Sequence, residues 1–206
     1  MSRQSHQQFQ FKQFLVKQDR CAMKVGTDGV LLGAWAEGGQ RVLDIGTGTG
    51  LIALMMAQRF PEAVIDAIDI DLDAVEQARE NVFASPFADR ITVVNCALQD
   101  YVPAHLQTTF PVEDDVRQMG VYDAIVCNPP FFVDSLKNPD KKRAIARHTD
   151  SLPFRLLMKR VASLLTADGI CSLVLPGEVK NVVEDEALIY GLSKVKEVYI
   201  KTKLNK

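Results

Sequence analysis

The chain has 206 residues, 47% of them hydrophobic, and a formal net charge of −2. This is enough for one sizeable core, so we expect a single domain over residues 1–206, with residues 1–38 as an N-terminal covering segment and 39–206 as the main fold. No apolar run approaches the roughly 20 residues of a membrane span, and the N-terminus lacks the apolar core of a signal peptide. We therefore expect a cytoplasmic protein without a membrane partner.

Neither a metal site nor a disulfide framework is indicated. The four cysteines show no C-x-x-C spacing and the three histidines do not cluster along the chain. Reduced cysteines packed in or near strands are the expected state.

Positive charge is concentrated in three stretches, residues 1–25, 134–160 and 194–206. They hold 18 of the 24 basic residues and only 5 of the 26 acidic ones. If the three stretches meet on one face, that face suits a polyanion, although ordinary solvated surface explains any one of them.

The N-terminal part predicts two small elements. Phe9–Val16 carries apolar residues at near-alternate positions, which favours an edge strand or hairpin. Thr27 and Asp28 are capping candidates for a short apolar helix that follows and ends before Gly38.

The main fold begins with a buried strand, Arg41–Ile45, and a glycine-rich turn, residues 46–50, that leads into a helix. Glycines let the main chain approach a ligand, and free N–H groups at a helix N-terminus can meet an anionic group. A second strand, Val64–Asp69, ends in an acid suited to bridging two ribose hydroxyls. Asp71 is the expected N-cap of the next helix.

Further strands and helices alternate along the chain. They predict an α/β fold with a doubly wound, mostly parallel sheet. We expect strands at 91–96, 122–127, 169–175 and 195–200, and helices at 154–165 and 179–192.

Asn128 stands where the strand 122–127 ends, and it is followed by Pro129, Pro130 and Phe131. The prolines fix φ, remove two donors and keep Asn128 extended. The Asn oxygen and the Pro129 carbonyl are neutral acceptors for one planar NH2 group, and Phe131 can stack on the ring that bears it. This chemistry fits an exocyclic amine that acts as a nucleophile, with Asn128, Pro129, Pro130 and Phe131 as the catalytic candidates.

The pairing of D-x-G-x-G-x-G at Asp44–Gly50 with the later N-P-P-F resembles the S-adenosylmethionine (SAM) dependent amino-methyltransferases. The stretch from Phe14 to Trp35, with Asp19-Arg20-Cys21-Ala22 and Gly26-Thr27-Asp28-Gly29, is similar to the opening of the bacterial family that methylates N6 of adenosine 37 in valine tRNA. The resemblance extends from about Phe9 to about Pro176.

The resemblance implies a class I, Rossmann-like methyltransferase, SAM as cofactor, and the anticodon loop of a tRNA as partner. In the family the N-terminal segment lines the SAM pocket and faces the target base. The sheet of such enzymes ends in a seventh strand after the sixth, so residues 1–206 would lack a complete last strand. The implied cofactor residues are Thr27, Asp44, Gly46, Gly48, Gly50, Asp69, Ile70, Ala97 and Asn128.

Two points depart from the family pattern or stay open. Ala97 stands where the family usually has an Asp that receives the adenine amine, so either the nearby backbone or Asp100 takes this role. The N-P-P-F motif also serves methyltransferases of rRNA guanine N2 and of a release-factor glutamine, and a SAM- and RNA-binding module without turnover is a further alternative. Cations beside the motif that could hold RNA phosphates are Lys141, Lys142, Arg143 and Arg147.

Overall fold

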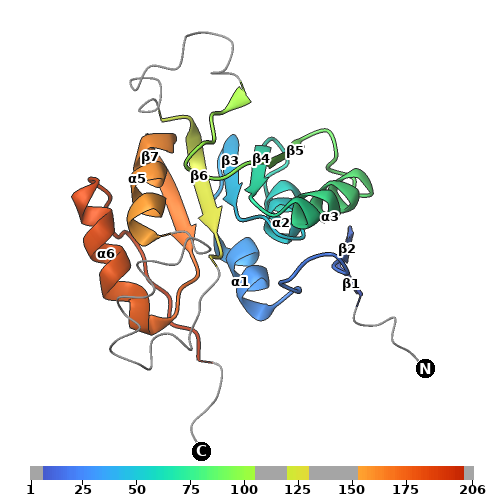
Figure 1. Ribbon diagram of the computed structural model, residues 1–206, viewed down its shortest axis with the longest axis horizontal. Coiled ribbons are helices and arrows are strands. Elements are labelled where there is room, and N and C mark those ends of the chain that lie inside the picture. The colour runs from blue at the N-terminus through green and yellow to red at the C-terminus, as the bar shows by residue number, and fades with distance from the viewer. Residues whose placement is uncertain (1–6, 105–119, 130–152, 202–206) are drawn as a thin grey trace, which may run out of the picture.

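The computed structural model describes residues 7–104, 120–129 and 153–201. Five strands form one parallel sheet in the order β5-β4-β3-β6-β7, and helices lie on both of its faces (Figure 1). The prediction of a doubly wound α/β fold is confirmed. The sheet strands are β3 (Arg41–Ile45), β4 (Val64–Asp69), β5 (Ile91–Asn95), β6 (Tyr122–Cys127) and β7 (Leu165–Leu173).

The helices divide between the two faces. On one side lie α1 (Thr27–Trp35), α2 (Leu51–Arg59) and α3 (Leu72–Phe83), and on the other lie α5 (Phe154–Leu164) and α6 (Lys180–Ile189), the latter preceded by the 3-10 turn η6 (Gly177–Val179). Alternate residues of one strand serve both cores, because successive side chains point to opposite faces. Val42 of β3 packs with the first group of helices, and its neighbour Leu43 packs with the second.

The order of the strands creates a switch point between β3 and β6. From β3 the chain moves outward to β4 and β5, and it then returns to the other side of β3 to form β6 and β7. Right-handed crossovers in opposite directions place their helices on opposite faces. The loops after β3 and β6 therefore leave the sheet in different directions. In open α/β sheets, ligands bind in the crevice outside the carboxyl ends of two such strands.

An antiparallel hairpin precedes the sheet, formed by β1 (Gln8–Gln10) and β2 (Leu15–Lys17). This confirms the hairpin expected over Phe9–Val16. Its residues Phe14 and Val16 are buried in the core of the α1, α2 and α3 face. The hairpin is thus part of that core.

Helix α1 sits unusually close to α2. A Cβ atom on Gly33 would lie 2.7 Å from Met55 Sδ and 2.9 Å from Met55 Cβ. Arg59 at the end of α2 donates from Nη1 to the carbonyls of Gly33 (3.0 Å) and Ala36 (2.8 Å), which closes the C-terminus of α1. Each of the two helices therefore fixes the position of the other.

Two local predictions were wrong. The N-cap of α1 is Gly26, without a side-chain cap, and Thr27 is the first helical residue, so neither Thr27 nor Asp28 caps the helix. Residues 195–200 form no strand. Their side chains are exposed, Val195 to 75% and Tyr199 to 74%, and Glu197 pairs with Lys180 (2.7 Å). Apolar residues such as these form a strand only where a neighbouring strand takes their backbone groups.

Asp71 behaves as expected and caps α3, since its Oδ1 accepts the Asp73 amide at 3.0 Å. Among the helices that the structure describes, none has the length and apolar character needed to cross a bilayer.

The close contact of α1 and α2 gives a first prediction. Gly33→Ala should lower the free energy of unfolding by about 1–3 kcal/mol, because the new Cβ would clash with the Met55 Cβ, which the α2 backbone fixes. Urea unfolding measures this. Gly177→Ala is the control, since a Cβ there meets nothing within 4 Å, and it should change stability by less than about 0.5 kcal/mol. Equal stability of the two variants would show that the helices are not in tight contact.

Candidate active site

The carboxyl ends of three adjacent strands bring the predicted site residues together. Ile45 of β3 pairs with Ile68 of β4 on one side and with Cys127 of β6 on the other. The residues that follow in register, Gly46, Asp69 and Asn128, therefore lie side by side at one edge of the sheet. The glycine turn and the Asn-Pro motif meet at the switch point.

The glycine turn has a backbone that only glycine adopts easily. Gly46, Gly48 and Gly50 have φ values of 70°, 55° and 80°, in the left-handed region. A Cβ at Gly46 or Gly48 would meet nothing within 4 Å, whereas one at Gly50 would lie 3.4 Å from the Ala78 Cβ of α3. The first two glycines thus face open space, and the third allows α3 to approach.

Four amides of the glycine turn donate hydrogen bonds within the protein. Those of Gly46 and Thr47 donate to the Ile68 carbonyl at 2.9 and 3.0 Å, and that of Gly50 donates to the Thr47 carbonyl at 2.9 Å. The Gly48 amide donates to Asp69 Oδ2 at 2.8 Å. Three of these four amides are thus bound to β4, so an anionic group meets fewer free amides in the turn itself than the glycine spacing alone indicates.

Asp44 lies fully buried beneath the turn. Its Oδ2 accepts the Thr47 hydroxyl at 2.6 Å and the Ala53 amide at 3.1 Å, while Oδ1 has no partner among the described residues. Burial raises the pKa of this carboxyl to about 7, against the two hydrogen bonds that lower it. A buried acceptor without a partner is a natural contact for a cationic or donor group of a ligand.

Asp69 links β4 to the turn and stands at the edge of the open space. Its Oδ1 accepts the Asp71 amide at 3.0 Å, in addition to the Gly48 amide on Oδ2. The next residue, Ile70, is 74% exposed although it is apolar. Asn95 holds this corner from β5, because its Nδ2 donates to the carbonyls of Asp69 (3.0 Å) and Ile70 (3.1 Å). A carboxylate beside an exposed apolar side chain suits a ribose and a flat base.

Ala97 lies in the turn that follows β5, and its carbonyl accepts the Asp100 amide at 3.0 Å. Arg160 of α5 fixes this segment, since it donates to the carbonyls of Leu98 (3.2 Å) and Tyr101 (2.6 Å). Asp100 is exposed. The two alternatives for contacting the adenine amine, the backbone near Ala97 and the Asp100 side chain, thus belong to one turn that Arg160 holds in place.

Asn128 is half-buried and packs against α1. A Cβ on Gly29 would lie 3.8 Å from Asn128 Nδ2, an ordinary contact, and 3.3 Å from Leu51 Cδ2, so the absence of a side chain here chiefly makes room for Leu51. Pro129 is buried. Thr27 is exposed at the start of the same helix turn. Pro130 and Phe131 lie outside the described residues, as do Lys141, Lys142, Arg143 and Arg147.

Comparisons with known proteins fit this geometry. Residues 25–152 match the model of the methyltransferase small domain family. A tRNA1(Val) (adenine(37)-N6)-methyltransferase of Parabacteroides distasonis is 52% identical over 93% of this chain and 76% of its own length. A protein of the same name from Phocaeicola vulgatus is 53% identical over 95% of this chain and 77% of its own length.

The chain belongs to the tRNA1(Val) (adenine(37)-N6)-methyltransferase family. The resemblance in the N-terminal and N-P-P-F stretches is thereby confirmed. The fold is also that of a solved methyltransferase from Pyrococcus furiosus, at a TM-score of 0.53 and 23% identity, covering 84% of this chain and 75% of that one.

The basic residues of this family member are not all available to a polyanion. Lys17 pairs with Glu80 at 2.6 Å, and Arg20 pairs with Glu76 (3.6 Å) and Glu80 (3.7 Å). The Lys24 ammonium donates to the carbonyl of Cys21 at 3.1 Å. In the C-terminal stretch, Lys194 pairs with Glu184 and Glu197. The described cations of the stretch 134–160 are also partly engaged, since Arg160 is buried and donates to main-chain carbonyls, and Arg155 donates to the Tyr190 hydroxyl (3.3 Å).

Several residues that shape the site were not predicted. Gln77 and Asn81 are polar residues on the inner face of α3, at 0% and 1% exposure, and Gln18 is a buried polar residue before α1. The sequence offered only a weak indication of Gln77 and Asn81, namely two polar residues one helical turn apart beside the apolar face of the helix. The main-chain partners of Gln77 and Asn81, at Lys17, Arg20 and Thr49, are distant in sequence, which no local pattern reveals.

The buried Asp44 gives a prediction for pH dependence. Its pKa in the folded state, about 7, lies above the usual 3.8, so the folded state keeps a proton that the unfolded chain loses. Stability should therefore fall as the pH rises from about 4 to about 7, by up to about 1.4 kcal/mol per pH unit. Asp44→Asn should flatten this slope in urea unfolding curves.

The matched control is Asp28→Asn, which removes the same charge from an exposed position and should keep the wild-type slope. If Asp44→Asn and the wild type show the same pH dependence, Asp44 is ionised throughout this range and burial does not raise its pKa.

Proposed function

We propose that this protein transfers a methyl group from SAM to N6 of adenosine 37 in the anticodon loop of tRNA1(Val). The observation that carries the proposal is the position of Asn128 beside the glycine turn, in a chain about half identical to relatives named for this reaction. Membership of the family supports the reaction class. The position of the glycine turn beside Asn128, at the carboxyl ends of β3 and β6, supports a site where cofactor and acceptor meet.

The described residues fit the cofactor. Gly46 and Gly48 border open space, and Asp69 and exposed Ile70 stand at its rim. The unpartnered Oδ1 of Asp44 lies below the turn. In our proposal Asp69 holds the ribose, Ile70 contacts the adenine, and the turn with Asp44 receives the methionine end. Thr27, Ala97 and Asn128 complete the pocket as further cofactor contacts. Bound there, SAM would supply an activated methyl group on a cationic sulfur.

The acceptor side requires orientation more than base strength. The lone pair of an exocyclic amine is delocalised into its ring, so the amine is a weak nucleophile. Hydrogen bonds from the amine to Asn128 Oδ1 and to the Pro129 carbonyl would fix its direction and favour positive charge on the nitrogen as the bond forms. A neutral carboxamide suffices because the amine loses its proton only after the methyl group has arrived.

Entry of the base has a cost that the motif offsets. Extruding adenine from the loop costs a few kcal/mol, and stacking on an aromatic ring returns roughly 1–3 kcal/mol. We assign this role to Phe131, with Pro130 as the rigid spacer. The cations Lys141, Lys142, Arg143 and Arg147 would hold the flanking phosphates.

The test is methylation of purified tRNA in vitro. The protein is incubated with isotopically labelled SAM and tRNA from a strain that lacks the activity, and the product is digested and analysed by mass spectrometry. We expect N6-methyladenosine at position 37 of tRNA1(Val). Label in guanine N2, in a protein glutamine or in no acceptor would replace the proposal with one of the alternatives.

For the acceptor side, Asn128→Ala should reduce kcat by at least about 100-fold, because the amine loses one of its two acceptors, while SAM binding changes less than about threefold. Steady-state methylation and calorimetry measure the two quantities. Gln58→Ala, an exposed amide on α2, is the control and should leave both unchanged. Full activity in Asn128→Ala would remove this residue from the mechanism.

For the RNA side, the triple change of Lys141, Lys142 and Arg143 to Gln should weaken tRNA binding. It should also flatten the plot of log K against log salt by roughly 2, since each lost phosphate contact removes about 0.7–0.9 from the slope. The matched control changes Lys17, Lys180 and Lys194 to Gln. These cations are already paired with glutamates, so the slope should stay near the wild-type value. Equal slopes in both triple variants would mean that residues 141–143 make no phosphate contacts.

A further inference from the structure

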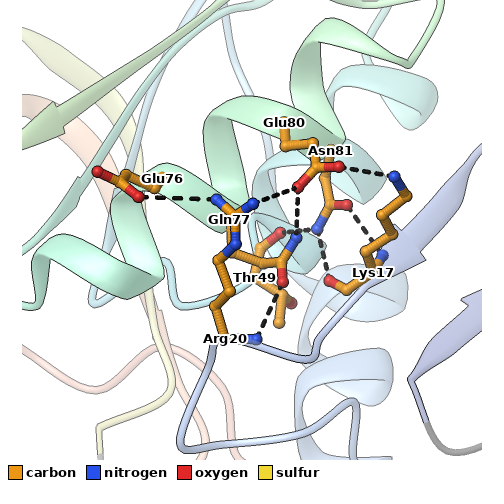
Figure 2. A network of polar contacts seen from close by, with 7 residues as sticks. All are labelled: Lys17, Arg20, Thr49, Glu76, Gln77, Glu80 and Asn81. Carbon is orange, nitrogen blue, oxygen red and sulfur yellow. Dashed lines mark hydrogen bonds and ion pairs between the residues drawn. The ribbon is translucent and has the colours of Figure 1, made fainter.

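Two buried carboxamides on α3 face the N-terminal segment of the chain. Gln77 and Asn81 stand one helical turn apart, and both are almost completely shielded from solvent. Figure 2 shows them between the helix and the main chain of residues 17–20. Burial of two amides is unfavourable unless their hydrogen bonds are made, so their partners indicate what they hold.

Asn81 binds two segments at once. Its Oδ1 accepts the Lys17 amide at 2.9 Å, and its Nδ2 donates to the carbonyls of Lys17 and of Thr49, both at 2.8 Å (Figure 2). Thr49 lies between Gly48 and Gly50 in the glycine turn. One side chain thus uses both donors and its acceptor to join the turn to the end of β2.

The contact with Thr49 completes the support of the glycine turn. Asp44 holds the turn from below through the Thr47 hydroxyl and the Ala53 amide, and Asp69 holds it from β4 through the Gly48 amide. Asn81 is the support from α3. A turn that presents two glycines to open space depends on such external contacts, because it has no side chains of its own there to keep its shape.

The N-terminal segment held by Asn81 continues toward the same site. Residues 18–25 form a closed loop, since Gln18 Oε1 accepts the Val25 amide at 2.6 Å. Gln77 Oε1 accepts the Arg20 amide at 3.1 Å and fixes the start of this loop on α3. Cys21 in this loop is buried, and the loop leads into α1, where a Cβ on Gly29 would lie 3.8 Å from Asn128 Nδ2.

We propose that Asn81 is a positioning residue which joins the glycine turn at Thr49 to the end of β2 at Lys17 and thereby sets the affinity for SAM. The inference rests on the proposed function, because it takes the space beside the turn as the SAM pocket. An apolar side chain at this position would leave the Lys17 amide and the Thr49 carbonyl desolvated and without this partner. Gln77 accepts the Arg20 amide and donates from Nε2 to Glu80 Oε2 (3.3 Å) on the same helix, and neither contact reaches the glycine turn, so it offers a matched comparison.

The experiment compares Asn81→Ala with Gln77→Ala. Each variant loses one fully buried carboxamide from α3, but only the first loses a contact with the glycine turn. We expect Asn81→Ala to raise the Kd and the KM for SAM about tenfold or more, with kcat and the KM for tRNA within about threefold of the wild type. Gln77→Ala should stay within about threefold for all of these. Calorimetry and steady-state methylation provide the values, and urea unfolding shows that the two variants are similarly stable.

A SAM affinity of Asn81→Ala within twofold of the wild type would overturn the inference, and so would an equal loss in both variants, which would indicate general loosening of α3. If Asn81→Ala does not fold, Asn81→Ser takes its place and the same comparison applies. Wild-type protein that binds SAM but does not methylate tRNA would refute the proposed substrate and leave the role of Asn81 intact. Wild-type protein that does not bind SAM would refute both.

Discussion

Parallel hydrogen bonding between β3 and β6 places the end of the glycine-turn strand beside the end of the strand that precedes Asn128. The register Ile45 to Cys127 fixes this arrangement, and the pairing of Ile45 with Ile68 adds Asp69 on the other side. Because a shift of one residue would turn every side chain of the strand to the opposite face, the two buried cores enforce the register. The site is therefore a consequence of core packing on both faces of the sheet.

The electrostatics of this edge agree with a cationic cofactor and a neutral acceptor. Asp69 stands at the rim, and Asp44 lies buried below the turn with one unpartnered oxygen. Acidic groups near the turn favour a positively charged ligand over a dinucleotide phosphate. Asn128 and Pro129 are uncharged, which suits an amine that must remain neutral until it attacks. In the proposed site, this division of charge suits a sulfonium beside a weak nucleophile.

The N-terminal part of the chain completes the site from outside the sheet. The hairpin is anchored in the core through Phe14 and Val16, and the loop 18–25 connects β2 to α1. Gly29 of α1 then lies against Asn128. These two residues thus become neighbours although they are 99 positions apart in the sequence (128 minus 29). The ion pairs of Lys17 and Arg20 with α3 lie at the surface and add little by comparison.

Much of the fold could be predicted from the sequence, since β3, β4 and β6 have the bounds that their apolar runs indicate. The family could be predicted from its motifs. Residues 195–200 could not be assigned correctly, because β-branched and aromatic residues also occur in an exposed segment. The occupied amides of the turn and the contacts of Asn81 could not be predicted, because their partners are brought together only by the fold.

In our proposal the glycine turn and Asn128 border one pocket. A crystal structure of the protein with S-adenosylhomocysteine tests this arrangement most directly. We expect the methionine portion of the ligand along residues 46–50, its ribose on Asp69, and its sulfur facing Asn128. Electron density for the ligand away from the carboxyl ends of β3 and β6, or a sulfur that points away from Asn128, would contradict it.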